Sequence, residues 1–170
     1  MSVHNQIETR QAAKGGAIAG IVAGAILALF LVATSLAGGR DIWMPLKGAG
    51  APFLGERAMQ PGFDAVALAV GALGHFAVSA LWGAAFGLLF YGLSKGTTMV
   101  AGFFWGFAVW IGMYYLVLPL IGLGDMARGT PLSLAIIEHL LFGIVLGSAF
   151  LPFQREYPGS AMPRAPRPSS

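Results

Sequence analysis

One stretch of the chain decides the fold class: residues 16–37, which read GAIAGIVAGAILALFLVATSLA. It holds no charged residue and is longer than the about 20 residues that a helix needs to cross about 30 Å of hydrocarbon. Arg10 and Lys14 precede it, as basic residues precede a signal sequence. Its apolar run exceeds the about 7 to 15 residues of a signal h-region, so we expect a retained span. This stretch predicts a transmembrane helix.

Three further apolar stretches, 66–93, 99–123 and 132–153, are also long enough to span a bilayer. The whole chain of 170 residues is 56% hydrophobic and only 10% charged, whereas an average soluble domain is roughly 25% charged. A water-soluble fold of this size would need more polar side chains to cover its surface. The sequence therefore predicts an all-α, antiparallel four-helix bundle in the membrane, over residues 15–154, after an N-terminal cytoplasmic segment, 1–14.

The composition excludes several classes of function. There is no cysteine, so disulfides, thiolate zinc sites and iron–sulfur clusters are ruled out. The net charge of +3 is not gathered into a basic cluster, so we expect no nucleic-acid partner. Neither a phosphate-binding loop nor a Gly-x-Ser-x-Gly nucleophile motif is present. We therefore expect no catalytic residues, although the sequence leaves enzymatic activity open.

The basic residues favour one orientation. If both termini are cytoplasmic, six of them lie inside and four outside, which follows the positive-inside rule. The inside set is Arg10, Lys14, Lys95, Arg155, Arg164 and Arg167, and the outside set is Arg40, Lys47, Arg57 and Arg128. The tail 155–170, rich in proline, serine and arginine, is expected to be disordered. The long outer connection, 38–64, is expected to lie along the membrane surface, anchored by Trp43 and Phe53.

The two halves of the chain resemble each other. Ala19-Gly20-x-x-x-Gly24 in the first span matches Ala101-Gly102-x-x-x-Gly106 in the third. In the second span His75, Gly83 and Phe86 have the same spacing as His139, Gly147 and Phe150 in the fourth. Such a pattern indicates a duplicated helical hairpin whose two copies share one orientation.

Each span also carries a Gly-x-x-x-Gly pair, which makes a flat helix face where two backbones can approach closely. With the termini inside, all the pairs fall in the cytoplasmic halves of their helices. The bundle is therefore expected to be tight on that side and wider toward the outside. The pairs are Gly20 and Gly24, Gly83 and Gly87, Gly102 and Gly106, and Gly143 and Gly147.

A small set of polar residues lies within the spans at a similar depth. The two histidines lie about 12 to 15 Å from the outer ends of their helices. Ionisable residues at this depth are costly and often functional. We therefore expect a shared polar intramembrane site in the wider half of the bundle. Its members are His75, Ser79, Tyr114, Glu138 and His139.

Three interpretations of this site remain open. The first is a structural clasp, in which each histidine bonds a neighbouring carbonyl, serine or tyrosine. The second is a bis-histidine b-type haem with His75 and His139 as axial ligands; another metal would need a third ligand, for which only Glu138 or Met113 is near. The third is a proton or small-solute path in which Glu138, the histidines and Tyr114 form a relay.

From residue 15 to residue 154 the chain resembles small, uncharacterised four-span proteins of the bacterial inner membrane. The segments that carry this resemblance are GAPFLGERAMQPGF, GHFAVSALWG and EHLLFG. Some of these relatives are labelled sodium:proline symporters. Sodium:solute symporters place their sites between broken helices of two multi-helix repeats, an architecture that four spans in one protomer cannot supply.

The expected role is therefore that of a multi-pass membrane protein that works as a homo-oligomer or as an accessory subunit of a larger membrane assembly. A proton or solute transporter and a haem protein are the alternatives. No cofactor is expected for an oligomeric or accessory subunit or for a transporter; haem is expected only for the haem protein.

Overall fold

The computed structural model describes residues 3–155, with side chains described from residue 6, and within that range the chain forms helices and turns without a strand. Four helices are long and apolar enough to cross a membrane: Gln6–Ala37, Ala65–Phe90, Lys95–Leu120 and Leu132–Phe153. The prediction of an all-α chain with four long apolar helices is confirmed. The expected disordered tail lies outside the described residues, except for Arg155.

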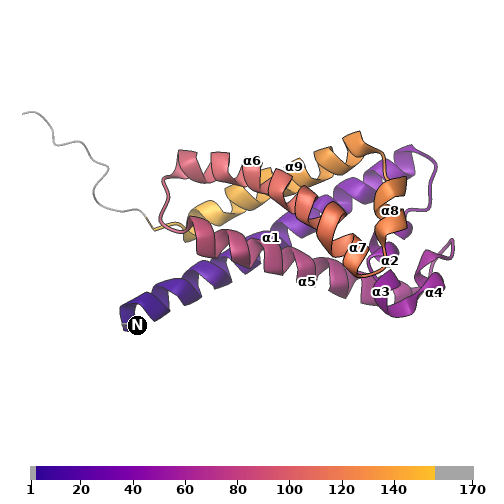
Figure 1. Cartoon of the computed structure of the whole chain (residues 1–170), viewed down its shortest axis with the longest axis horizontal. Helices are drawn as coiled ribbons and strands as arrows, with labels where there is room; N and C mark the ends of the chain where they lie inside the picture. The colour runs from indigo at the N-terminus through magenta and orange to yellow at the C-terminus, as the bar shows by residue number, and fades with distance from the viewer. Residues whose placement is uncertain (1–2, 156–170) are drawn as a thin grey trace, which may run out of the picture.

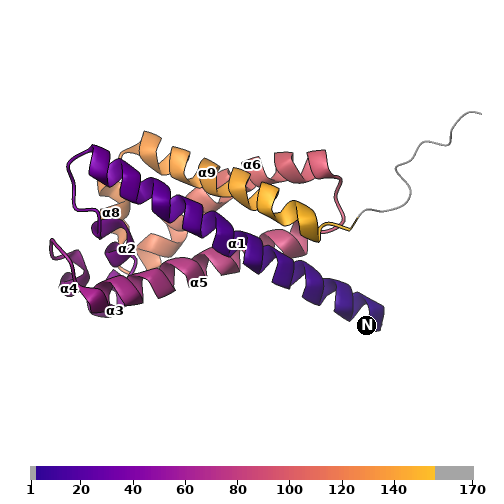
Figure 2. The ribbon, with the colours of Figure 1, turned by 180° about the vertical axis from the view of Figure 1, so that it is seen from behind.

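The four long helices lie along the long axis of the molecule (Figures 1 and 2). They are α1 (Val3–Ala37), α5 (Ala65–Phe90), α6 (Lys95–Gly112) and α9 (Leu132–Phe150). Helix α1 packs most extensively on α5 and also on α9, and α6 packs on α9, whereas α5 and α6 touch little. Both ends of the described chain lie at one end, here called the terminal end, and the short helices gather at the other, called the cap end (Figure 1).

Local sequence signals explain three of the helix boundaries. Helix α5 begins after Asp64, whose side chain accepts hydrogen bonds from the backbone N–H groups of Val66 and Ala67 at 2.9 and 3.0 Å. Helix α6 begins after Ser94, which caps it through the N–H of Thr97. Helix α5 ends before Gly92, whose φ of 89° only glycine adopts readily. The second span thus ends at Phe90, three residues before the predicted limit of 93.

Helix α1 begins well before the predicted span. It starts at Val3 rather than near residue 16. The polar residues that precede the apolar run, such as Gln6, Arg10 and Lys14, are good helix formers, and Glu8 forms an ion pair with Arg155 at the terminal end. Propensity and this ion pair therefore extend the helix beyond its apolar part.

The third span changes its winding near the cap end. After α6 the chain makes one π-helical turn, η1 (Met113–Val117), then α7 (Leu118–Leu120), and turns at Gly122 into α8 (Gly124–Gly129). Pro119 has no N–H to continue the ladder, and its ring would clash with a carbonyl of the preceding turn. The wider π turn relieves this conflict. The fourth span ends in a short 3₁₀ turn, η2 (Leu151–Phe153).

Glycines bring α1 and α5 into direct backbone contact. A Cβ on Gly20 would lie 2.9 Å from the Cα of Gly83 and would also strike the carbonyl of Ser79. A Cβ on Gly83 would lie 2.6 Å from the Cα of Gly20, and one on Gly87 would lie 3.0 Å from the Cα of Gly16. We call this contact the first seam. Only glycine fits it without moving a helix.

The contact between α6 and α9, called the second seam, uses residues at the matching positions. A Cβ on Gly102 would lie 2.6 Å from the carbonyl oxygen of Gly143 and 3.0 Å from the Cα of Gly147. A Cβ on Gly143 would lie 2.7 Å from the Cα of Gly106. In the alignment of the two halves, Gly102 corresponds to Gly20, and Gly143 and Gly147 correspond to Ser79 and Gly83. Since Gly20 faces Ser79 and Gly83 in the first seam, equivalent positions meet in both seams.

Between these seams, near the terminal end, large side chains fill the interior. Phe86 and Phe150 are fully buried, and their ring centroids lie 5.6 Å apart in an edge contact. Trp105 packs against Phe86 and Phe90 with centroids 6.0 and 5.7 Å away. This aromatic layer separates α5 from α6 and leaves that part of the molecule packed.

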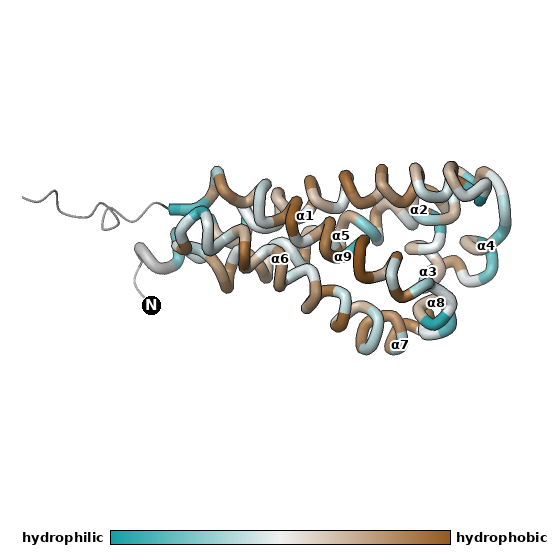
Figure 3. The backbone as a smooth tube through the Cα atoms, turned by 90° about the horizontal axis from the view of Figure 1, so that it is seen from above, coloured by the Kyte–Doolittle hydropathy of each residue, from teal (hydrophilic) through white to brown (hydrophobic). Residues whose placement is uncertain are grey.

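The connection 38–64 folds into a compact cap rather than only lying flat. It contains α2 (Met44–Gly48), α3 (Ala51–Leu54) and α4 (Glu56–Met59), and it packs on α5. Trp43 and Phe63 make an edge contact at 5.1 Å, and Phe53 is 74% exposed. Figure 3 shows hydrophilic residues concentrated in this cap and at the terminal end, with hydrophobic residues predominant along the helices.

Candidate functional site

His75 lies in the first seam. Its Nε2 is 2.9 Å from the carbonyl oxygen of Gly24 in α1, and the hydroxyl of Ser79 donates to the carbonyl of His75 at 2.8 Å. Gly24 has no side chain, which lets the imidazole and Ser79 approach this part of α1. With Nε2–H as the donor, both polar side chains are satisfied by main-chain oxygens. His75 therefore fastens α5 to α1, whereas the Ser79 hydroxyl bonds within α5.

Tyr114, Glu138 and His139 form a second group, between η1 and α9. The rings of Tyr114 and His139 make an edge contact with centroids 5.5 Å apart, and Nδ1 of His139 lies 2.8 Å from the carbonyl oxygen of Ala135. Glu138 is 8% exposed. Its carboxyl interacts electrostatically with Tyr114 and with Arg40, just beyond the end of α1. These residues meet at the cap-end half of the molecule.

The five predicted site residues thus fall into two groups. No hydrogen bond or ring contact among the described residues joins His75 and Ser79 to Tyr114, Glu138 or His139. The reason is the rotation of α5: its glycine face turns toward α1, and His75 follows that face to bond Gly24. A common depth along two helices does not fix a common direction, and each histidine turns to its own nearest carbonyl.

The residues do not fit a bis-histidine haem. An axial imidazole binds iron through a ring nitrogen lone pair, and Nε2 of His75 is hydrogen-bonded to Gly24. The glycines of these helices bring backbones together at the two seams. The part of the chain that the structure describes also holds no group of three or more His, Asp or Glu residues arranged to bind a metal ion.

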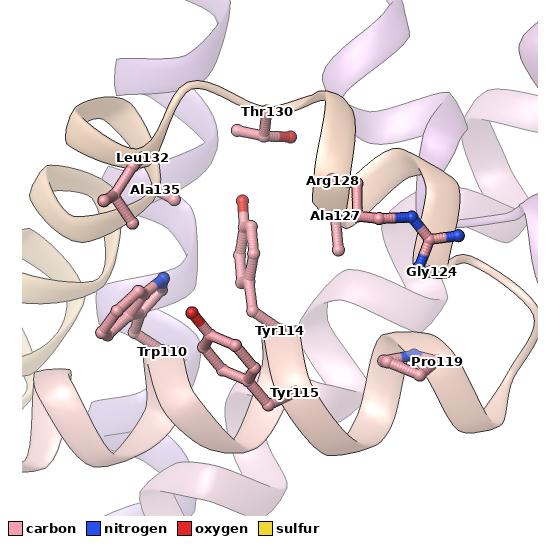
Figure 4. A pocket seen from close by; sticks show the side chains of 10 residues that line it. All are labelled: Trp110, Tyr114, Tyr115, Pro119, Gly124, Ala127, Arg128, Thr130, Leu132 and Ala135. Atoms are coloured by element: carbon pink, nitrogen blue, oxygen red, sulfur yellow. The ribbon is translucent and has the colours of Figure 1, made fainter.

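A cavity of about 440 Å³ lies beside the second group, at the cap end. The residues that line it come from the end of α6, η1, α7, α8 and the start of α9 (Figure 4). They are Trp110, Tyr114, Tyr115, Pro119, Gly124, Ala127, Arg128, Thr130, Leu132 and Ala135. Of the predicted site residues, only Tyr114 belongs to this wall.

The cavity wall is mainly apolar and carries a few polar groups. In Figure 4 the hydroxyl of Tyr114 points toward that of Thr130, and the hydroxyl of Tyr115 points toward the Trp110 ring. The Trp110 Nε1–H is buried and has no hydrogen-bond partner in the described part of the chain. Thr130 donates its own proton to the carbonyl of Met126 at 3.0 Å. A buried donor without a partner is uncommon; Trp105, which does not line the cavity, carries another.

The π turn explains how two successive tyrosines reach one cavity. In a regular α-helix neighbouring side chains diverge by about 100°. The turn Met113–Val117 is wider, and both Tyr114 and Tyr115 line the same cavity. Such turns often occur at functional sites. Sequence reasoning omitted Trp110, Thr130 and Arg128; the signal that could have indicated them is Pro119, which disturbs the helix just after an aromatic pair.

The cap contains a buried lysine. Lys47 is fully buried, and its Nζ donates hydrogen bonds to the carbonyls of Gln60 and Gly62 and lies 3.9 Å from a carboxylate oxygen of Asp41. Asp41 accepts from the N–H groups of Trp43 and Gly62 at 2.9 and 2.8 Å. These hydrogen bonds, with the charge of Lys47, hold the pKa of Asp41 below its ordinary value. Lys47 therefore ties the two ends of the cap together.

Asp64 has a second electrostatic role at the end of the cap. Arg57 donates two hydrogen bonds to its carboxylate, at 2.8 and 3.1 Å, while the same carboxylate caps α5. These hydrogen bonds, first of all that from Arg57, lower the pKa of Asp64 to about 2. The same pair raises the pKa of Arg57. The cap and the start of α5 thus share one ion pair.

The chain was compared with known proteins. No protein-family model, no curated protein and no solved structure matches it.

Proposed function

We propose that this chain is a multi-pass protein of the bacterial inner membrane, with its four long helices crossing the bilayer as an antiparallel bundle built from a duplicated hairpin. The length and hydropathy of the helices support the spanning role. The excess of basic residues on the side of the termini supports a cytoplasmic terminal end and an outward-facing cap.

Within that membrane the proposed role is that of an oligomeric or accessory subunit. The observation that carries this proposal is the packing of the interior. Two glycine seams and an aromatic layer fill it, and His75 and Ser79 bond main-chain oxygens. The polar residues of the first seam therefore act as a structural clasp.

The outer surface suits contact with lipid or with another subunit. Large apolar side chains project from α5 and α6 in the described chain, among them Leu73, Leu81, Leu89, Phe104 and Ile111. A surface of this kind is ordinary in a bilayer, and neighbouring subunits can share it.

The role is tested by isolating the full chain from native membranes under mild detergent and measuring its mass and its partners by native mass spectrometry. The expected result is a defined homo-oligomer or a stoichiometric membrane partner, kept in His75→Ala because that imidazole acts within one chain. A monomer without a partner would contradict the proposal. Reporter fusions at Lys95 and near Gly50 test the orientation: Lys95 is expected in the cytoplasm and Gly50 outside.

Glu138 supports a second candidate, a small proton or solute transport function. This carboxyl is largely buried and interacts electrostatically with Arg40 and Tyr114. Ionisable groups in this position often belong to proton relays. The expected result is pH-dependent flux in proteoliposomes that Glu138→Gln abolishes and that Glu56→Gln, on an exposed glutamate of the cap, leaves unchanged. Intact flux in Glu138→Gln would exclude this relay.

A further inference from the structure

The cap arranges polar and apolar side chains in the reverse of the order usual in water. Lys47 is fully buried, and its ammonium group donates to the carbonyls of Gln60 and Gly62 inside the cap. Phe53 and Phe63, in contrast, are 74% and 64% exposed. A segment folded in water ordinarily buries phenylalanine and leaves lysine at its surface. This arrangement favours a cap surface that meets an apolar medium.

The charges of the cap are balanced. Residues 38–64 carry three basic and three acidic side chains, so their net charge is zero. They are Arg40, Lys47 and Arg57, and Asp41, Glu56 and Asp64. Lys47 lies near Asp41, and Arg57 is hydrogen-bonded to Asp64. A surface without net charge does not attract a strongly charged partner or an anionic lipid over a neutral one. The exposed apolar side chains therefore decide what covers the cap.

The exposed side of the cap continues a stripe of exposed apolar residues along α5. The members of this stripe recur every seven or eight residues, and two turns of a helix take about 7 residues, so they share one side of α5. They are Val66, Leu73, Leu81 and Leu88. Phe63 comes three residues before Val66. In the membrane-spanning arrangement proposed above, acyl chains cover this stripe and reach the start of α5.

The second exposed phenylalanine belongs to the same region. Phe53 lies in α3, which packs on α5, and Figures 1 and 2 show α3 beside the start of α5. Trp43 makes an edge contact with Phe63 at 5.1 Å, so an indole ring lies next to the other exposed ring. Segments that combine exposed aromatic and charged side chains lie at the boundary between hydrocarbon and head groups. The cap is joined directly to the ends of two spans, which places it at that boundary.

We propose that the cap is a membrane-interface anchor. Phe53 and Phe63 enter the leaflet that surrounds the cap end, just below its head groups, while the exposed carboxylate of Glu56 stays in water. The leaflet is bound without selection for lipid charge, and the anchor fixes the depth of the first hairpin in the bilayer. This inference rests on the membrane-spanning role proposed above.

The test measures the depth of single positions in the full chain, reconstituted in lipid vesicles. Because the chain has no cysteine, a nitroxide can be attached to one introduced cysteine at a time. Collisions with oxygen and with a polar nickel complex are then measured by electron paramagnetic resonance. A nitroxide among acyl chains meets mainly oxygen, one in water meets mainly the nickel complex, and one enclosed by protein meets little of either.

Four variants supply the test and its references. Phe53→Cys and Phe63→Cys are expected to meet mainly oxygen, at a depth between those of Leu81→Cys, on the stripe of α5, and Glu56→Cys, on the cap. Leu81→Cys is expected in the hydrocarbon and Glu56→Cys in water. The depths are expected to be equal in vesicles of phosphatidylcholine and in vesicles that also contain phosphatidylglycerol. Circular dichroism checks that each labelled variant keeps its helices.

The possible results separate this inference from the proposed function. If positions 53 and 63 meet mainly the nickel complex while position 81 meets oxygen, the anchor is excluded and the spanning role stands. Protection from both reagents at 53 and 63 would also overturn the anchor, because a protein surface would then cover the cap. Insertion only in vesicles with phosphatidylglycerol would overturn the charge-independent binding. If position 81 itself meets mainly the nickel complex, the spanning role fails, and the anchor fails with it.

Discussion

The two hairpins, α1 with α5 and α6 with α9, are built on the same seam but end differently. In each seam a glycine of the first helix faces the same pair of positions in the second: Gly20 faces Ser79 and Gly83, and Gly102 faces Gly143 and Gly147. At the cap end the first hairpin is covered by a folded connection, whereas the second holds a cavity. Close packing of glycines therefore fixes the helix arrangement that both hairpins share, and the two connections determine how their cap ends differ.

Two matching positions of the seams, Gly83 and Gly147, differ in tightness. A Cβ on Gly83 would lie 2.6 Å from the Cα of Gly20, but a Cβ on Gly147 would lie 3.3 Å from the Cα of Gly102. The second position needs a shift of only a few tenths of an ångström. The matching positions of the two hairpins are therefore expected to respond differently to the same substitution.

The largest effect is expected from Gly83→Ala, because its methyl group would meet the backbone of α1 and push the helices apart. We expect a loss of about 3 kcal/mol in the free energy of unfolding, against about 1 kcal/mol for Gly147→Ala. Thermal or denaturant unfolding in detergent measures both. Gly96→Ala is the control, since nothing lies within 4 Å of a Cβ there. Equal losses at Gly83 and Gly147 would remove the distinction between these two positions.

A smaller effect is expected from Lys47→Met, which tests the cap that distinguishes the first hairpin. The substitution keeps most of the apolar chain but leaves the carbonyls of Gln60 and Gly62 without their donor. We expect a loss of about 2 kcal/mol, confined to the cap. Hydrogen exchange should rise over residues 38–64 and stay unchanged over α8. Lys14→Met, on an exposed lysine of α1, serves as the control.

A pH effect is expected next, at the start of α5 in the first hairpin. The pKa of Asp64 is lowered to about 2, so the pair with Arg57 and the cap of α5 stabilise the fold above the ordinary pKa of an aspartate, near 3.8. This stabilisation is lost as the pH falls from about 4 toward 2. Hydrogen exchange at the start of α5 should increase over that range. Asp64→Asn should flatten the pH dependence, and an unchanged profile would contradict the assignment.

The start of α9 offers the internal reference for that experiment. It follows Pro131, without a side-chain cap. Its exchange rate is expected to lack the step attributed to Asp64.

The smallest effect is expected from Arg128→Gln. Its ion pair with Asp125 is exposed on both sides, at 73% and 97% of the side-chain surface, so solvent screens it. No measurable change in unfolding is expected. A clear loss of stability would show that the Arg128 side chain stabilises the second connection. The second connection would then resemble the cap, which is stabilised by the side chain of Lys47.

The long helices and their glycine faces could be predicted from the sequence, because the length of an apolar run and the spacing of its glycines are properties of a single helix. The run 16–37 and the Gly-x-x-x-Gly pairs indicated long apolar helices with close contacts. The predicted single polar site was harder, since helical spacing gives the depth of His75 and His139 but not the rotation of α5 and α9 against their neighbours. The shared-site hypothesis therefore has no support from the contacts of these residues.

The spacing of residues along the sequence could not indicate the fold of the cap or the presence of the cavity. Lys47 looked like an outer-loop charge that marks topology, and only the fold of the connection shows it buried against the carbonyls of Gln60 and Gly62. Nothing in the sequence distinguished Trp110 from the other residues of its apolar stretch. Its unpartnered N–H became visible only when η1, α8 and α9 were placed around it.

The sequence by itself determined that the chain makes long apolar helices and where their flat faces lie, because hydrophobic length and small residues act within each helix. The tertiary structure decided which carbonyl each histidine bonds, that a lysine is enclosed by the cap, and that one hairpin keeps a cavity where the other is covered. Those outcomes depend on helix rotation and on how two unequal connections fold back, which are set by contacts between segments far apart in the chain.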